Sequence, residues 1–121
     1  MSVYALRGAT TVEENDREAI LEATREMLGE LLERNSLSAD DLVSAIFTVT
    51  DDLNAEFPAL AAREMGLSAV PLLCAREIPV PGSMPGVIRV LVHYRAADGA
   101  EAQHVYLRRA SELRSDLGSA Q

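Results

Sequence analysis

Arginine residues inside apolar, strand-like segments are the feature of this sequence most suited to chemistry. Arg7 ends the apolar run SVYALR, and Arg89 lies within VIRVLVHY. Leaving one such charge buried and unpaired costs about 3–5 kcal/mol, so each arginine needs a partner. Glu77 could neutralise one of them through an internal salt bridge, but two arginines facing one acid leave a surplus of positive charge. Such a surplus suits an anionic ligand, most naturally a small carboxylate.

The other reactive side chains do not form a recognisable site. His93, His104 and Cys74 lack ligand spacing such as CxxC or HxxxH, so we expect no metal site. Cys74 has no base close to it in the sequence, and a buried, unreactive thiol is the simpler interpretation. Gly82 and Gly86 lie among prolines with no helix after them, which argues against a phosphate-binding loop.

Composition restricts the classes of binding partner and the cellular location that we expect. The 121 residues carry a net charge of −8, which argues against nucleic acid and anionic membranes as partners. No apolar run is long enough for a membrane span, and a single cysteine favours a reducing, cytoplasmic location. We expect one domain over residues 1–121, with residues 116–121 as a flexible tail.

Hydrophobic patterning predicts an α+β fold in which a mixed five-stranded sheet is combined with one long and one short helix. The expected strands are residues 2–7, 42–50, 70–75, 87–95 and 103–107. Asn15 and Glu18 have the form of a capping box for the long helix, which should end near Asn35. Pro58 suits the start of the short helix and Gly66 its end. The first strand, the long helix and the second strand suggest a βαβ unit with parallel strands.

The strand VIRVLVHY has apolar residues on both of its faces. Alternation places four of them on one face and two on the other: Ile88, Val90, Val92 and Tyr94, then Val87 and Leu91. Two helices cover roughly one face of a sheet, so the second face needs another partner. A second copy of the chain is the simplest one, and we expect a homo-oligomer.

Five segments together resemble the small monofunctional chorismate mutases of the AroH class. They are LRGATTVEEND, FTVTDDLNAEFPALAARE, VPLLCAREIPVPGSMPGVIRV, HVYL and LRSDL, and they extend from about Tyr4 to Leu117. The resemblance implies a trimeric pseudo-α/β-barrel with active sites at the subunit interfaces. It also implies the Claisen rearrangement of chorismate to prephenate, a step of phenylalanine and tyrosine biosynthesis. That reaction needs no metal and no organic cofactor.

The resemblance assigns roles to five residues. Arg89 stands where the family places the cation that stabilises negative charge on the ether oxygen. Glu77 and Cys74 would contact the ring hydroxyl, and Arg7 and Tyr106 would hold the side-chain carboxylate. Arg89 and Glu77 should then be held apart, one for the oxygen and one for the hydroxyl.

Three further segments would bind the substrate by resemblance: Leu73, Ala75 and Arg76 as the pocket wall, Phe57 and Arg63 from the neighbouring subunit, and Leu113 and Arg114 from the tail. The sequence departs from the family pattern at Leu60, where a basic residue is frequent, and at Leu73, where a threonine is familiar. Two alternatives remain at this point. One is a trimeric enamine/imine deaminase of the RidA type, and the other is a non-catalytic trimer that binds a metabolite.

Overall fold

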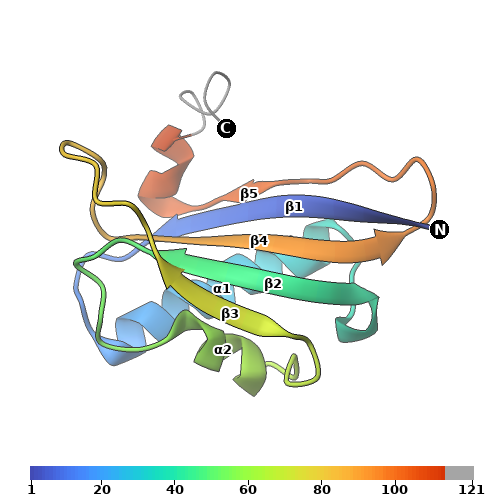
Figure 1. Cartoon of the computed structure of the whole chain (residues 1–121), viewed down its shortest axis with the longest axis horizontal. Coiled ribbons are helices and arrows are strands. Elements are labelled where there is room, and N and C mark those ends of the chain that lie inside the picture. Colours follow the sequence, from blue (N-terminus) through green and yellow to red (C-terminus); the bar gives the residue numbers. More distant parts are fainter. Residues whose placement is uncertain (114–121) are drawn as a thin grey trace.

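The structure, a computed structural model, describes residues 1–113 as a five-stranded sheet with two helices packed on one of its faces (Figure 1). The strands are β1 (Ser2–Thr11), β2 (Leu42–Val49), β3 (Leu72–Arg76), β4 (Val87–Ala96) and β5 (Val105–Tyr106). The helices are α1 (Arg17–Arg34) and α2 (Pro58–Glu64), and two 3₁₀ turns are η1 (Ala39–Asp41) and η2 (Arg108–Glu112). The predicted α+β class and mixed five-stranded sheet are confirmed.

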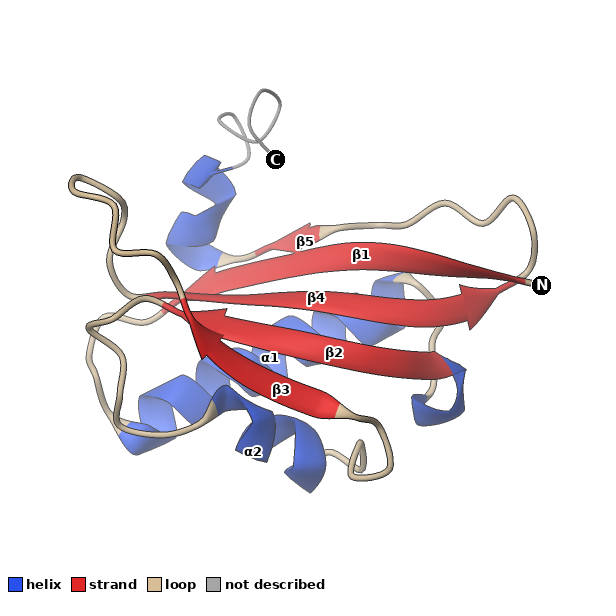
Figure 2. Cartoon of the chain, in the orientation of Figure 1, coloured by secondary structure: helices blue, strands red, loops and turns tan. Residues whose placement is uncertain are grey.

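The strand order is β3-β2-β4-β1-β5. β4 runs antiparallel to both of its neighbours, β1 and β2, so those two strands are parallel to each other. The predicted βαβ unit is therefore present, but β4 is inserted between its two strands (Figure 2). Local patterning could not reveal this insertion, because strand pairing depends on contacts far apart in the sequence.

The first strand is longer than the sequence predicted, because it continues through Gly8 to Thr11. Gly8 is needed for packing and not for a turn. A Cβ atom at this position would lie 3.0 Å from Val90 Cγ1 and 3.1 Å from Leu31 Cδ1. The missing side chain thus allows α1 to approach the sheet closely.

The N-terminal cap of α1 is also one residue from its predicted place. The Asp16 side chain accepts a hydrogen bond from the backbone N–H of Ala19 at 3.0 Å, which makes Asp16 the capping residue. Asn15 instead accepts hydrogen bonds from the backbone N–H groups of Asn54 and Ala55, each at 3.0 Å. Asn15 therefore fixes the loop before α2 against the start of α1.

The hydrophobic core lies between the sheet and the helices. Phe47 of β2 and Tyr94 of β4 are the bulkiest of its fully buried side chains, and Met27 and Leu31 of α1 pack in the same cluster. On the opposite face of the sheet, the apolar side chains of Val3, Leu73 and Leu91 are 60%, 60% and 37% exposed. One face of the sheet is thus covered within the chain and the other, called the open face below, is not. No helix in residues 1–113 is both long and apolar enough to cross a membrane.

Candidate active site

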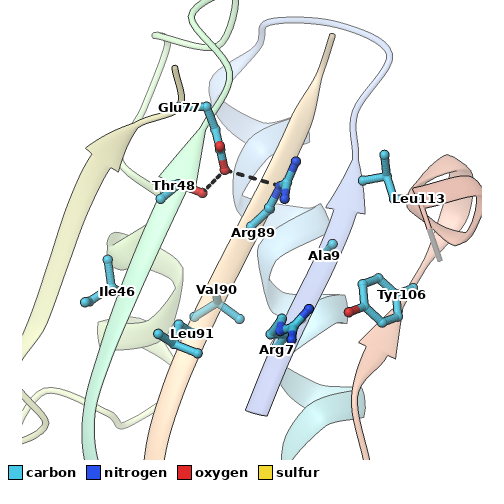
Figure 3. Close-up of a pocket in the computed structure, with 11 residues that line it drawn as sticks. Arg7, Ala9, Ile46, Thr48, Glu77, Arg89, Val90, Leu91, Tyr106 and Leu113 are labelled. Atoms are coloured by element: carbon cyan, nitrogen blue, oxygen red, sulfur yellow. Dashed lines mark hydrogen bonds and ion pairs between the residues drawn. The ribbon is translucent and has the colours of Figure 1, made fainter. Parts of the chain in front are cut away.

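Two rows of side chains cross the open face of the sheet and form the floor of a pocket of about 370 Å³ (Figure 3). Strand register sets both rows: Thr48, Arg89, Ala9 and Tyr106 lie in the first, and Ile46, Leu91 and Arg7 lie in the second. Alternation along each strand brings these side chains to the face opposite the helices. Ala9 is the only small side chain of the first row, so it leaves space between Arg89 and Tyr106.

Glu77, directly after β3, forms one wall of this pocket. Its backbone N–H donates to the Val49 carbonyl at 2.8 Å and continues the ladder between β2 and β3. The Thr48 hydroxyl donates a hydrogen bond to Glu77 Oε2, and Arg89 Nε lies 3.2 Å from the same oxygen. Glu77 Oε2 is therefore held from two sides.

The pairing of Arg89 with Glu77 corrects the expectation that the two side chains are held apart. Their contact is an ion pair without an aligned hydrogen bond, because Arg89 Nε is buried and makes no hydrogen bond to any described residue. The two side chains are 37% and 25% exposed, so water screens the attraction between them. An ion pair of this kind can be rearranged by a ligand at modest cost.

Arg7 and Tyr106 form the other end of the pocket. In Figure 3 the Tyr106 hydroxyl points toward the Arg7 guanidinium. The backbone N–H of Arg7 donates to His104 Nδ1 at 3.0 Å, so His104 extends the edge contact between β1 and β5. Burial of the ring, together with the nearby charge of Arg7, lowers the pKa of His104 below its ordinary value of 6.5. The neutral ring is the form that accepts this hydrogen bond.

Leu113, at the end of η2, closes the pocket above Ala9 and Tyr106 (Figure 3). A wider hollow of about 730 Å³ adjoins the pocket at Glu77, Arg89 and Leu113 and continues beneath the loop of residues 78–85. The lining of the first pocket contains two arginines and one glutamate, which leaves one positive charge in excess. Pocket size and charge both suit a small anionic ligand.

The structure does not bring Cys74 into this pocket. Cys74 pairs in register with Phe47, and its side chain packs against the core on the helix-covered face. Glu77 and Thr48 lie on the opposite face, so the thiol is not beside the Glu77 carboxylate as expected. Of Cys74 itself, only the backbone is available to a ligand on the open face of the same chain.

The other predicted residues that the structure describes do not line the pocket of their own chain. A separate hollow of about 420 Å³ beside β3 and the start of α2 is lined in part by Phe57, Cys74, Ala75 and Arg76. Leu73 is exposed on the open face, and Phe57 is 67% exposed. Arg63 is an exposed residue of α2, and Arg114 lies outside the described residues.

Thr48 is the polar pocket residue that sequence reasoning missed. Its partner Glu77 is 29 residues away in the chain, and only the pairing of β2 with β3 brings them together. One signal was available: Thr48 directly follows the buried Phe47, so alternation places its side chain on the open face, as it does that of Ile46. Ala9 was missed because a small residue in a strand does not indicate a site.

The fold and the pocket thus define an α+β protein with a cationic, ligand-sized pocket on one face of its sheet. The family profile of chorismate mutase type I matches residues 3–117. Chorismate mutase AroH of Thermus thermophilus is 54% identical over 121 residues, which cover 98% of this chain and 99% of the relative. Chorismate mutase AroH of Bacillus subtilis is 38% identical over 119 residues, which cover 97% and 94%.

A solved structure gives the same result for the fold. Chorismate mutase from Clostridium thermocellum superposes with a TM-score of 0.88 at 48% identity, covering 91% of this chain and 99% of that one. The chain belongs to the type I chorismate mutase family. Members of this family are isomerases, so the deaminase alternative loses its support.

Proposed function

We propose that this chain converts chorismate to prephenate in the pocket on the open face of its sheet. The observation that carries the proposal is the placement of Arg7 and Arg89 on neighbouring strands of one pocket, with Glu77 beside Arg89, in a chorismate mutase chain. In the rearrangement a C–O bond breaks while a C–C bond forms within one molecule, and no proton or electron is exchanged with the protein. The pocket therefore has to hold a compact conformation and stabilise the charge that develops.

Arg89 would stabilise the negative charge that grows on the ether oxygen. Arg89 lies in the first row, between Thr48 and Ala9, and its side chain lines the pocket. Its ion pair with Glu77 is partly exposed and lacks an aligned hydrogen bond, which leaves the guanidinium available to a ligand. A charge fixed before the reaction stabilises the transition state without reorganisation at the moment of bond breaking.

Glu77 would accept a hydrogen bond from the ring hydroxyl of the substrate. Thr48 and Arg89 both contact Oε2, whereas no described residue is hydrogen-bonded to Oε1. The Cys74 thiol is on the other face, so we restrict this residue to a contact through its backbone. Leu73, Ala75 and Arg76 would likewise contribute as the wall that β3 forms.

Arg7 and Tyr106 would bind the carboxylate of the enolpyruvyl side chain. They lie at the end of the pocket opposite Glu77, and the phenol hydroxyl and the guanidinium point toward each other (Figure 3). A carboxylate between them would receive hydrogen bonds from two directions, one of them charge-assisted. The bound substrate would then be oriented with its ring hydroxyl at Glu77 and its side-chain carboxylate at Arg7.

We further propose that the chain works as a cytoplasmic homotrimer, with each active site completed by a neighbouring subunit. The open face exposes Val3, Leu73 and Leu91, and apolar side chains exposed together on one face favour an interface. Phe57, 67% exposed, and Arg63 would reach the pocket of the adjacent subunit. Leu113 already lines the pocket. Arg114, which lies outside the described residues, would bind the substrate as the resemblance implies.

The activity is tested by following the ultraviolet absorbance of chorismate. We expect turnover by the purified chain and a loss of about 10²–10³ in kcat/KM for Arg89→Ala, the usual effect of removing one charge-stabilising donor. Arg89→Lys should recover only part of the rate, because an ammonium group differs from a guanidinium in reach and geometry. Chorismate that raises the melting temperature of the wild-type chain but is not consumed would favour the non-catalytic alternative.

The shared site is tested by mixing two inactive variants. Arg89→Ala and Arg63→Ala remove groups that, in the proposed trimer, come to one site from different subunits. Unfolding the two together and refolding them should produce some sites with both arginines intact and therefore restore activity. Unchanged inactivity in mixed oligomers verified by mass spectrometry would contradict sites shared between subunits, while leaving the chemistry proposed for Arg89 unaffected.

A further inference from the structure

The turn that leads from β5 into η2 is built on an arginine with an unusual backbone conformation. Arg108 has a φ of +52°, in the left-handed region that favours glycine. Within residues 1–113 the one other non-glycine residue with positive φ is Ser36, which follows α1 far from the pocket. A non-glycine residue in this region carries a conformational free-energy cost. The contacts that hold Arg108 in this conformation therefore need to be identified.

The Arg108 side chain ties this turn to two other elements. Its Nη1 donates to the backbone carbonyl of Thr11, at the end of β1, over 3.1 Å, and its Nε donates to Glu26 of α1 over 3.2 Å. The next residue adds a third contact, because the backbone N–H of Arg109 donates to Thr11 Oγ1 at 3.2 Å. The side chain of Arg108 and the backbone of Arg109 thus attach η2 to the end of β1.

The attached turn carries two pocket residues, one on each side of Arg108. Tyr106 precedes it by two positions and Leu113 follows it by five, and both line the pocket. Leu107 N–H donates to the Ala9 carbonyl at 2.9 Å, which ends the pairing of β5 with β1 immediately before the turn. The conformation at Arg108 therefore sets the direction in which the chain leaves β5 toward Leu113.

We propose that Arg108 is a positioning residue of the active site, which holds Tyr106 and Leu113 against the pocket by fixing the β5–η2 turn to Thr11 and Glu26. The inference rests on the substrate contacts proposed above for Tyr106 and Leu113. Arg108 itself does not line the pocket and acts through these two residues.

A purely stabilising role would not account for an arginine at this position. The ion pair of Arg108 with Glu26 joins side chains that are 38% and 48% exposed, and such pairs contribute little to folding. Glycine would adopt the observed φ without steric cost. What glycine could not supply is the bond to the Thr11 carbonyl, which joins the turn to the strand that also carries Arg7 and Ala9.

The test compares Arg108→Gly with the matched variant Ser36→Gly, which relaxes the same backbone conformation away from the pocket. Both variants should have a melting temperature equal to or above that of the wild type. Only Arg108→Gly should raise KM for chorismate, by about fivefold with kcat changed less than twofold, because the lost contacts act on the bound substrate and the transition state alike. Ser36→Gly should leave both constants at their wild-type values.

Two results would overturn the proposal. One is a KM for Arg108→Gly equal to that of Ser36→Gly, and the other is a lowered melting temperature with activity lost in proportion to folded protein. Glu26→Gln should raise KM less than Arg108→Gly, since the Thr11 contact remains, and an equal rise would exclude the Thr11 contact as the cause. Wild-type turnover, which tests the proposed function itself, is measured in the same experiment and does not depend on these outcomes.

Discussion

The two faces of β4 differ sharply although they alternate along one strand. On the helix-covered face Ile88, Val90, Val92 and Tyr94 are at most 3% exposed, whereas Leu91 on the open face is 37% exposed. The covered face is a packed core in which side-chain volume determines stability. The open face carries the arginines, so charge and spacing matter there more than volume. Substitutions on the two faces should therefore affect different measurements.

The largest expected effect on stability is on the covered face. Phe47→Ala removes a fully buried ring and should lower the free energy of unfolding by about 3–5 kcal/mol, measured by urea denaturation. Leu91→Ala, on the open face, is the matched control and should cost about 1 kcal/mol. A larger loss for Leu91→Ala than for Phe47→Ala would contradict the division between the faces.

The second effect is catalytic and lies on the open face. Thr48→Val keeps the shape of the side chain but removes the hydroxyl that holds Glu77 Oε2. Glu77 would then be free to pair more closely with Arg89, and we expect kcat to fall about tenfold, since small displacements of catalytic groups have effects of this size or greater. Steady-state kinetics of Thr48→Ser, which retains the hydroxyl, should stay near the wild type. Equal losses in both variants would show that the hydrogen bond is not responsible.

The third expected effect is a gain in stability, and it is again on the covered face. The Thr10 hydroxyl is fully buried and hydrogen-bonded to no described residue, so Thr10→Val should raise the free energy of unfolding by about 1 kcal/mol. Thr24 provides the control, because its buried hydroxyl donates to the Ile20 carbonyl at 2.7 Å. Calorimetry should find no gain for Thr24→Val, and a comparable gain there would point to a general effect of removing hydroxyls.

The smallest effect concerns pH at the sheet edge beside Arg7. His104 has a pKa lowered by burial and by Arg7, so the unfolded chain binds its proton more readily than the folded chain. The stability from its neutral ring is complete above a pH of about 6.5 and is lost as pH falls through the lowered folded-state pKa. The difference in unfolding free energy between the wild type and His104→Gln should shrink on acidification. A difference independent of pH from 7.5 to 5 would contradict this assignment.

Much of the fold could be predicted because the local patterns are clear. Period-two alternation identified the strands that carry Arg7 and Arg89, and it correctly predicted that both face a half-buried space. Pro58 and Gly66 marked the limits of the short helix, and Gly66 has the positive φ expected of a helix stop. These features depend on neighbouring residues, so the sequence contains enough information to find them.

The features that were missed depend on contacts between distant segments. The insertion of β4 between β1 and β2 follows from long-range pairing, and the Thr48 contact to Glu77 follows from register. Gly8 was interpreted as a strand end because its reason, the close approach of α1, is not visible in one segment. The expectation that Cys74 lies beside Glu77 within one chain failed for a different reason. Cys74 lies three positions before Glu77, so alternation already placed the two side chains on opposite faces of the sheet.

Alternation within β1 and β4 also has a consequence for laboratory evolution of this protein. Arg7, Ala9, Arg89 and Leu91 can be randomised together in a library without touching the residues between them, which pack against the helices. Most clones of such a library should still fold, and selection would then act mainly on catalysis and substrate preference. A library at the intervening positions would mostly return unfolded clones. Substitutions at two neighbouring positions of one strand should thus affect different properties. Those on the open face should change substrate specificity, and those on the covered face should change stability.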